Sequence, residues 1–147
     1  MIVLVCGGRE FGKLPKQEFR NGPEWEQKEK EYLFVMQQLD LFSIEHSQYY
    51  DSQDNWLPSD IEIVSGGATG VDTAAIDWAV VNWCKFREYE AQWDKYGKAA
   101  GHMRNLEMLD KEPIDIVLAF PGGKGTADTV RQAKLRNVQV IEYAFEG

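Results

Sequence analysis

The sequence predicts an α/β fold of three layers, α/β/α, around a mainly parallel sheet of about five strands. Three short apolar runs, "IVLVC", "IEIV" and "IDIVLAF", have the length of buried strands, and each leads into a glycine-containing turn. Helix-like segments separate these runs, and strands that alternate with helices imply right-handed crossovers and a parallel sheet covered on both faces. In such sheets ligands bind beyond the carboxyl ends of the strands, where the three turns would meet.

The expected strands differ in how they end. They are placed at 2–6, 61–64, 85–91, 114–120 and 138–143. The first strand stops at Gly7-Gly8, the second at Ser65-Gly66-Gly67 and the fourth at Pro121-Gly122-Gly123. No glycine-containing turn follows the last strand, so the turns after the first, second and fourth strands are the candidates for a shared crevice.

Helices are expected between the strands. Pro23 in a first turn starts one helix over about 23–42. Thr69 and Asp72 match a capping box ahead of an apolar helical face. Two further helices are expected near 98–110 and 126–136, the former with Ala99, Met103, Leu106 and Leu109 inward. The polar segment around 43–60 is expected to be a loop or insertion within a single domain that spans residues 1–147.

Charge and composition restrict the class of partner. The chain has 24 Asp and Glu against 16 Lys and Arg, for a net charge of −8, and its basic residues are scattered. Nucleic-acid binding depends on neutralising phosphates, so this balance argues against a nucleic-acid partner. A local pocket can nevertheless be positive inside an acidic surface.

Metal binding and membrane insertion are not expected. Cys6 and Cys84 have no CxxC partner, and the only histidines are His46 and His102, so we predict no metal site. Cys6 is expected to pack in the core rather than to act as a nucleophile. The apolar start "MIVLVCGG" has no basic leader, and no apolar run approaches 18 residues, which predicts a cytoplasmic protein without a membrane span.

The glycine turns favour anion binding without matching a standard nucleotide motif. Glycine lets the backbone approach a ligand, and a helix that begins just afterwards directs free N–H groups and a partial positive charge at it. "CGGREFG" and "SGGATG" do not fit G-x-G-x-x-G, and residues 123–125 lack the Walker spacing and its Lys-Thr pair.

Four blocks carry a resemblance to a known superfamily. "VCGGREF", "SGGATGVDTAAIDWA", "WDKYGKAAGHMRNLEML" and "AFPGGKGTADTV" resemble, in this order, the motifs of the YspA-like branch of the SLOG superfamily. That superfamily includes the LOG-type phosphoribohydrolases and the DNA-processing protein DprA/Smf. The resemblance implies a Rossmann-like fold, a homodimer, and a nucleotide or nucleotide-derived ligand, such as an ADP-ribose-like or nucleoside phosphate compound, bound as by a sensor or carrier. No other cofactor is implied.

The resemblance also implies which residues bind the ligand. Carried over by position, they are Gly7, Gly8 and Arg9; Gly66, Gly67, Thr69, Gly70 and Asp72; Arg104 and Asn105; and Pro121, Gly122, Gly123, Lys124, Gly125 and Thr126. Thr126 can cap its helix or donate to a phosphate, and Arg9 or Arg104 can bind an anion with a bidentate fork. Asp72 is either the carboxylate of the capping box or an acceptor for a ribose hydroxyl.

Catalysis is the open alternative. LOG-type enzymes release a base from a nucleoside monophosphate and resemble this chain at Arg104 and the PGGxGT loop, but they carry a glutamate where this sequence has Thr129. A neutral hydroxyl cannot stabilise an oxocarbenium ion. Arg104 and Asp128 are the catalytic candidates that remain, although Asp128 is turned by about 100° from the expected position on a helix and has a shorter stem. DprA-like binding of single-stranded DNA ranks last because of the net charge.

For several side chains near the motifs, the sequence allows both a functional and a structural role. Lys124 either contacts a phosphate or is solvated, and His102 is either a ligand-binding or catalytic residue or a polar residue of a first helical turn. Trp93 and Tyr96 either stack on a base or anchor their loop. Trp78 and Trp83 are expected to make packing or dimer contacts.

Overall fold

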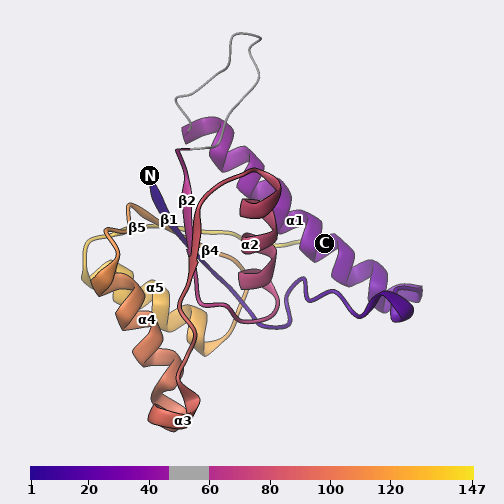
Figure 1. Ribbon diagram of the computed structural model, residues 1–147. Helices are drawn as coiled ribbons and strands as arrows, with labels where there is room; N and C mark the ends of the chain where they lie inside the picture. Colours follow the sequence, from indigo (N-terminus) through magenta and orange to yellow (C-terminus); the bar gives the residue numbers. More distant parts are fainter. Residues whose placement is uncertain (47–59) are drawn as a thin grey trace.

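The computed structural model describes residues 1–46 and 60–147, and its sheet has the expected strands in a parallel arrangement (Figure 1). The strands are β1 (Ile2–Cys6), β2 (Glu62–Ser65), β3 (Phe86–Glu88), β4 (Ile116–Ala119) and β5 (Gln139–Glu142). Their order in the sheet is β3-β2-β1-β4-β5, and every neighbouring pair is parallel. The predicted Rossmann-like α/β class is therefore confirmed.

The helices form the two outer layers. They are α1 (Gly22–His46), α2 (Val71–Val81), α3 (Trp93–Tyr96), α4 (Ala100–Lys111) and α5 (Lys124–Leu135), with 3-10 turns η1 (Gln17–Phe19) and η2 (Gly97–Ala99). Figure 1 shows α1 and α2 on one face of the sheet and α4 and α5 on the other, with α3 beyond the carboxyl ends of the strands. No helix among the described residues is long and apolar enough to cross a membrane.

The first long helix extends further than the sequence predicts. It continues to His46, so residues 43–46 are helical rather than part of a loop. Phe42 is buried in the core, and the His46 ring stacks on it with its Nδ1 within 2.8 Å of the Phe42 carbonyl oxygen. These contacts keep the last turn of α1 in place. The rest of the expected insertion, 47–59, lies outside the described residues.

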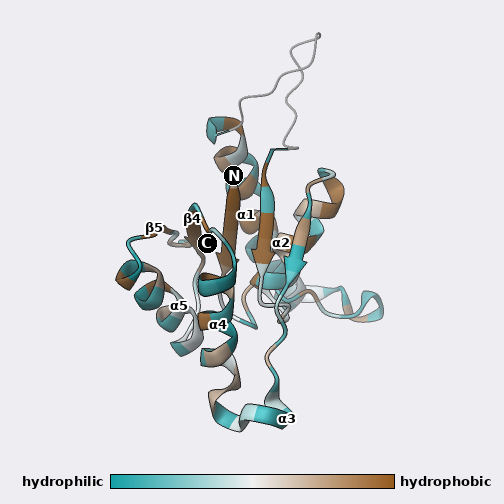
Figure 2. Ribbon diagram, turned by 60° about the vertical axis from the view of Figure 1, so that its left-hand side comes forward, coloured by the Kyte–Doolittle hydropathy of each residue, from teal (hydrophilic) through white to brown (hydrophobic). Residues whose placement is uncertain are grey.

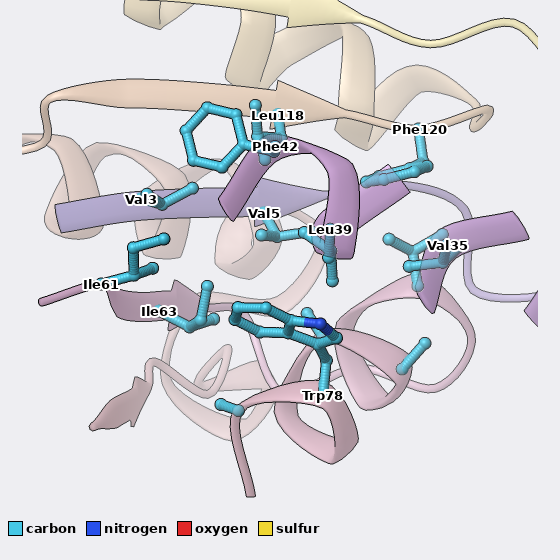
Figure 3. Packing of buried hydrophobic residues seen from close by; sticks show 14 of the residues in the cluster. Val3, Val5, Val35, Leu39, Phe42, Ile61, Ile63, Trp78, Leu118 and Phe120 are labelled. Carbon is cyan, nitrogen blue, oxygen red and sulfur yellow. The ribbon is translucent and has the colours of Figure 1, made fainter. Parts of the chain in front are cut away.

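Alternate residues of each central strand pack into two separate cores. Val3, Val5, Ile63, Ile116 and Leu118 face α1 and α2, whereas Leu4, Cys6, Val64, Val117 and Ala119 face α4 and α5. Figure 2 shows the hydrophobic residues concentrated on the central strands, and Figure 3 shows the first core around Trp78. Because both faces are covered, the strands are continuous apolar runs, as is typical of parallel sheets.

The predicted inward face of α4 is wrong in part. In α4 the buried residues are Ala100, Asn105, Met108 and Leu109, whereas Ala99 and Met103 are exposed. A polar residue, Asn105, takes an inward position because its amide makes hydrogen bonds to α5. Trp83 does not pack in the core, because α2 ends at Val81 and Trp83 follows with φ 59° and 91% exposure; its dimer contact stays a prediction.

Trp78 connects the two helices of one layer. Its side chain is 1% exposed, and its indole Nε1 donates to Asp40 Oδ1 of α1 at 2.8 Å. The Trp78→Ala substitution should lower the free energy of unfolding by about 3–5 kcal/mol, because it leaves a large cavity in the core. Urea denaturation measures this loss. The matched control is Trp83→Ala, which should change stability by less than about 0.5 kcal/mol; equal losses in both variants would contradict the packing assigned to Trp78.

Candidate functional site

A cavity of about 620 Å³ lies where the turns after β1 and β2 meet α4 and the start of α5. Most of the residues predicted to bind a ligand contribute to its wall: Gly7, Gly8, Arg9, Gly66, Asp72, Arg104, Asn105, Gly123, Lys124, Gly125 and Thr126. The catalytic candidate Asp128 contributes to it as well. The wall also includes His102 and Trp93, for each of which the sequence allows either a role at the ligand or a structural role. Tyr96 lies outside this wall. The sequence thus predicted the location of the cavity, while the binding role of each residue stays a prediction.

The remaining predicted residues lie around this cavity rather than on its wall. Gly67 and Thr69 line an adjoining cavity, and Pro121 and Gly122 lie on the far side of the loop before α5. Gly70 has φ +76°, and a side chain there would overlap the carbonyl of Gly8. Gly70 is therefore required for close packing of two turns and does not line the main cavity.

Backbone hydrogen bonds hold the turns against one another. The Gly8 N–H donates to the Pro121 carbonyl at 2.8 Å, and the Val71 N–H donates to the Gly8 carbonyl at 3.2 Å. The Thr69 hydroxyl donates to the Arg9 carbonyl at 2.9 Å. The predicted capping role of Thr69 is therefore wrong: α2 begins at Val71 with Gly70 as its N-cap.

The first turn of α5 is suited to an anion. The helix begins at Lys124, its N-cap is Gly123, and no side chain caps its first amides. The backbone of Gly123 to Thr126 lines the cavity. The N–H groups at the start of a helix carry a partial positive charge, so this turn can bind a phosphate oxygen.

Basic side chains outnumber acidic ones on the cavity wall. Arg9, Lys98, Arg104, Lys124 and Arg131 all contribute to it, whereas Asp72 and Asp128 are the only acidic members in the described part of the chain. The cavity is thus locally cationic in a protein whose net charge is −8. Lys98 and Arg131 were not predicted from the sequence. Arg131 could have been predicted from its position three residues after Asp128, since residues with this spacing are neighbours on a helix.

Arg104 is anchored by the turn after β2. Its Nη1 donates to the Gly66 carbonyl oxygen at 2.7 Å, and its Nε donates to Asn105 Oδ1 at 3.1 Å. A Cβ at Gly66 would lie 2.6 Å from that Nη1, so a side chain there would displace the guanidinium. Burial lowers the pKa of Arg104, and the Asp72 carboxylate opposes this shift. The guanidinium remains a cation and keeps N–H donors for a ligand.

A polar network joins α4 to α5 around Asp128. Its Oδ2 accepts from the Asn105 amide at 3.1 Å and lies 2.8 Å from His102 Nδ1, and its Oδ1 accepts from Arg131 Nη2 at 2.8 Å. Burial acts to raise the pKa of Asp128, but the hydrogen bonds from His102 and Asn105 outweigh it and lower the pKa. Asp128 is therefore an ionised part of the cavity wall, although its place on the helix suggested that it would point away.

Thr129 also borders the cavity, but its side chain is held in one orientation. Its side chain is buried, and its hydroxyl donates to the Gly125 carbonyl oxygen at 3.2 Å, one turn earlier in α5. This position therefore supplies a neutral group that is already engaged with the backbone.

Asp72 is the other acid of the wall. It is 6% exposed, and its Oδ2 accepts from the Ala68 N–H at 3.1 Å. Burial raises the pKa of Asp72 to about 6, although the hydrogen bond from Ala68 and the charge of Arg104 act against this shift. The carboxylate thus accepts from a residue that precedes the Gly70 N-cap rather than from the N-cap itself, as a capping box would require, and it also lines the cavity.

The cysteine in the wall is unreactive. Cys6 is buried in the core that faces α4 and α5, and burial raises the pKa of its thiol well above the usual value. A thiol that stays protonated is a poor nucleophile, so the structure places Cys6 in packing. Residues 1–46 and 60–147 contain no group of three or more His, Cys, Asp or Glu side chains arranged to hold a metal ion.

Comparison with known proteins relates the chain to a phage protein. The chain is 35% identical over 96 residues to the Gene 61 protein of Mycobacterium phage D29, a match that covers 58% of this chain and 74% of the phage protein. The chain belongs to the family of this phage protein. No protein-family model and no solved structure matches the chain.

The raised pKa of Asp72 makes this member of the gene 61 family sensitive to pH. An ionised Asp72 is unfavourable in the folded state, so its contribution to stability falls as pH rises from the unfolded pKa, near 4, to the folded pKa, about 6. Asp72→Asn removes this dependence and keeps an acceptor for Ala68. Relative to the parent, the variant should gain about 2 kcal/mol of unfolding free energy between pH 4 and pH 7.5. Urea titrations at both pH values measure the difference, and a constant difference would contradict the assigned shift.

Proposed function

We propose that this protein binds a nucleotide or a nucleotide-derived ligand and acts as a sensor or carrier of the YspA-like SLOG type. The observation that carries this proposal is the uncapped first turn of α5, which opens into a cavity lined by Arg9, Arg104 and Lys124. A phosphate at this turn would contact backbone N–H groups and have cationic side chains around it.

The shape of the cavity supports a ligand larger than phosphate. Its volume of about 620 Å³ falls in the range of cavities that hold small organic ligands, about 300–1,000 Å³. Asp72 and Trp93 contribute to the same wall as the α5 turn. A carboxylate that accepts from hydroxyl groups and an aromatic ring that packs on a flat group are both suited to a nucleoside.

A substitution at Gly125 tests the phosphate site with little disturbance of the fold. A Cβ at this position would meet no atom within 4 Å. Gly125→Asp places a negative charge at the α5 turn, whereas Gly125→Asn adds a neutral side chain of the same size. The Asp variant should lose binding at least tenfold relative to the Asn variant because its carboxylate repels phosphate and competes for the same amides.

The measurement is a thermal-shift panel with AMP, GMP, NAD, ADP-ribose and ribose 5-phosphate, followed by calorimetry. A ligand at 100 times its dissociation constant adds about 2.7 kcal/mol of stability. The parent and the Asn variant should show the full shift, whereas the Asp variant, at least tenfold weaker, should gain no more than about 1.4 kcal/mol at the same ligand concentration. Absence of any shift across the panel in the parent would reject the proposal.

The pair formed by His102 and Asp128 favours a second candidate, hydrolysis of an N-glycosidic bond. Because Asp128 is ionised, His102 Nδ1 donates to it. No residue of 1–46 or 60–147 forms a hydrogen bond with Nε2, which can therefore exchange a proton. In this reaction water attacks C1′ of a nucleoside monophosphate and loses a proton to Nε2. The C1′–N bond breaks, its electron pair stays on the base, and His102 returns the proton to the base nitrogen. The products are the free base and ribose 5-phosphate.

Base release from nucleoside monophosphates, followed by chromatography, tests this candidate. His102→Gln should lower the rate at least a hundredfold, since general acid–base catalysis contributes about 10²–10⁴, while ligand affinity stays within a few-fold. The control is His46→Gln, in which the other histidine of the chain, stacked on Phe42 in α1, is replaced. Absence of base release from every common nucleotide by the parent protein would reject hydrolysis and leave the binding proposal intact.

A further inference from the structure

A second cavity adjoins the first and shares part of its wall. It has a volume of about 350 Å³, and its members Arg9, Gly66, Ala68 and Trp93 also line the main cavity. Gly67, Thr69, Glu90 and Ala91 complete it. A ligand with its phosphate at the α5 turn can therefore extend past Arg9 and Trp93 into this second space.

The shared wall is formed by a cation and an aromatic ring. The guanidinium carbon of Arg9 lies 5.0 Å from the centroid of the Trp93 ring, a cation–π distance. The Thr69 hydroxyl holds the Arg9 backbone, and the Trp93 ring packs near Gly101 at the start of α4. Trp93 is nevertheless 48% exposed, because it comes from the short helix α3 that lies beyond the sheet (Figure 1). This wall offers a flat surface for a planar ring.

A carboxylate borders the same space. Glu90 follows the end of β3 and lines the second cavity, and its Cγ would lie 3.6 Å from a Cβ at Gly67. In the described part of the chain, no hydrogen bond or ion pair engages the Glu90 carboxylate. Its two oxygens are acceptors only, so they fit a partner that presents two adjacent donors.

We propose that this second cavity recognises the base of the ligand and selects guanine. The inference rests on the proposed function, because it assumes that the phosphate lies at the α5 turn. Guanine packs on the wall of Arg9 and Trp93, and its N1–H and exocyclic N2–H₂ donate to the two oxygens of Glu90. Adenine presents one amino group next to an acceptor at that edge, and hypoxanthine lacks the exocyclic amino group. A matched pair of hydrogen bonds to a base edge therefore discriminates guanine from both.

Calorimetric titration of GMP, IMP, AMP, 2′-deoxy-GMP and ribose 5-phosphate tests this assignment. The parent should bind GMP at least tenfold more tightly than AMP, with IMP between them and 2′-deoxy-GMP equal to GMP. Glu90→Gln should lower GMP affinity about tenfold and leave AMP unchanged. Trp93→Ala should weaken all nucleotides and leave ribose 5-phosphate unchanged.

The neighbouring glutamate provides a matched control. Glu88→Gln removes the same charge from β3, next to the same turn, at a side chain that lines neither cavity, so the preference for GMP should persist. Equal affinities of the parent for GMP and AMP would overturn the inference. A parallel loss of AMP and GMP in Glu90→Gln, together with weak binding of 2′-deoxy-GMP, would also overturn it and assign Glu90 to the ribose. If ribose 5-phosphate and all nucleotides fail to bind, the proposed function itself fails.

Discussion

The hydrogen bond from Arg104 to the Gly66 carbonyl is the contact on which the rest of the site depends. It joins α4 to the turn after β2, and it requires a residue without a side chain at position 66. The anchored helix brings His102 and Asn105 within hydrogen-bond distance of Asp128 on α5. Close packing between a backbone turn and a cation therefore positions the face of α4 that contacts Asp128.

The two acids of the cavity illustrate how position determines charge. Asp128 has donors from His102, Asn105 and Arg131, which together compensate the cost of its partial burial. Asp72 is more deeply buried. Desolvation dominates and raises its pKa, although the hydrogen bonds from the Ala68 amide and the Ser65 side chain act to lower it. An anionic ligand near Asp72 would meet less repulsion when this carboxyl is protonated, whereas Asp128 keeps its charge and its hold on His102.

The strands could be predicted from the sequence because a strand that is buried on both faces is a continuous apolar run. β1 was expected at residues 2–6 and is observed there, and the glycine turns lie at one edge of the sheet because its strands are parallel. The helical side of the cavity was harder to predict, because its members depend on the rotation of α4 and α5 about their axes. Asn105 faces inward against hydrophobic periodicity because its amide is hydrogen-bonded. Lys98 had no local pattern that marked it, and Arg131 had only its spacing of three residues from Asp128.

Position 129, where LOG-type enzymes carry a glutamate, is occupied by a threonine, and the structure shows which neighbouring groups remain for catalysis. The hydroxyl of Thr129 is engaged by the Gly125 carbonyl, so it supplies no charge to a bound sugar. The adjacent Asp128 does reach the cavity, but its oxygens are already shared among His102, Asn105 and Arg131. A carboxylate with these partners is poorly placed to stabilise a cation directly and well placed to orient an imidazole. Asp128 of α5 therefore orients His102, and in the proposed hydrolysis the proton is transferred through His102.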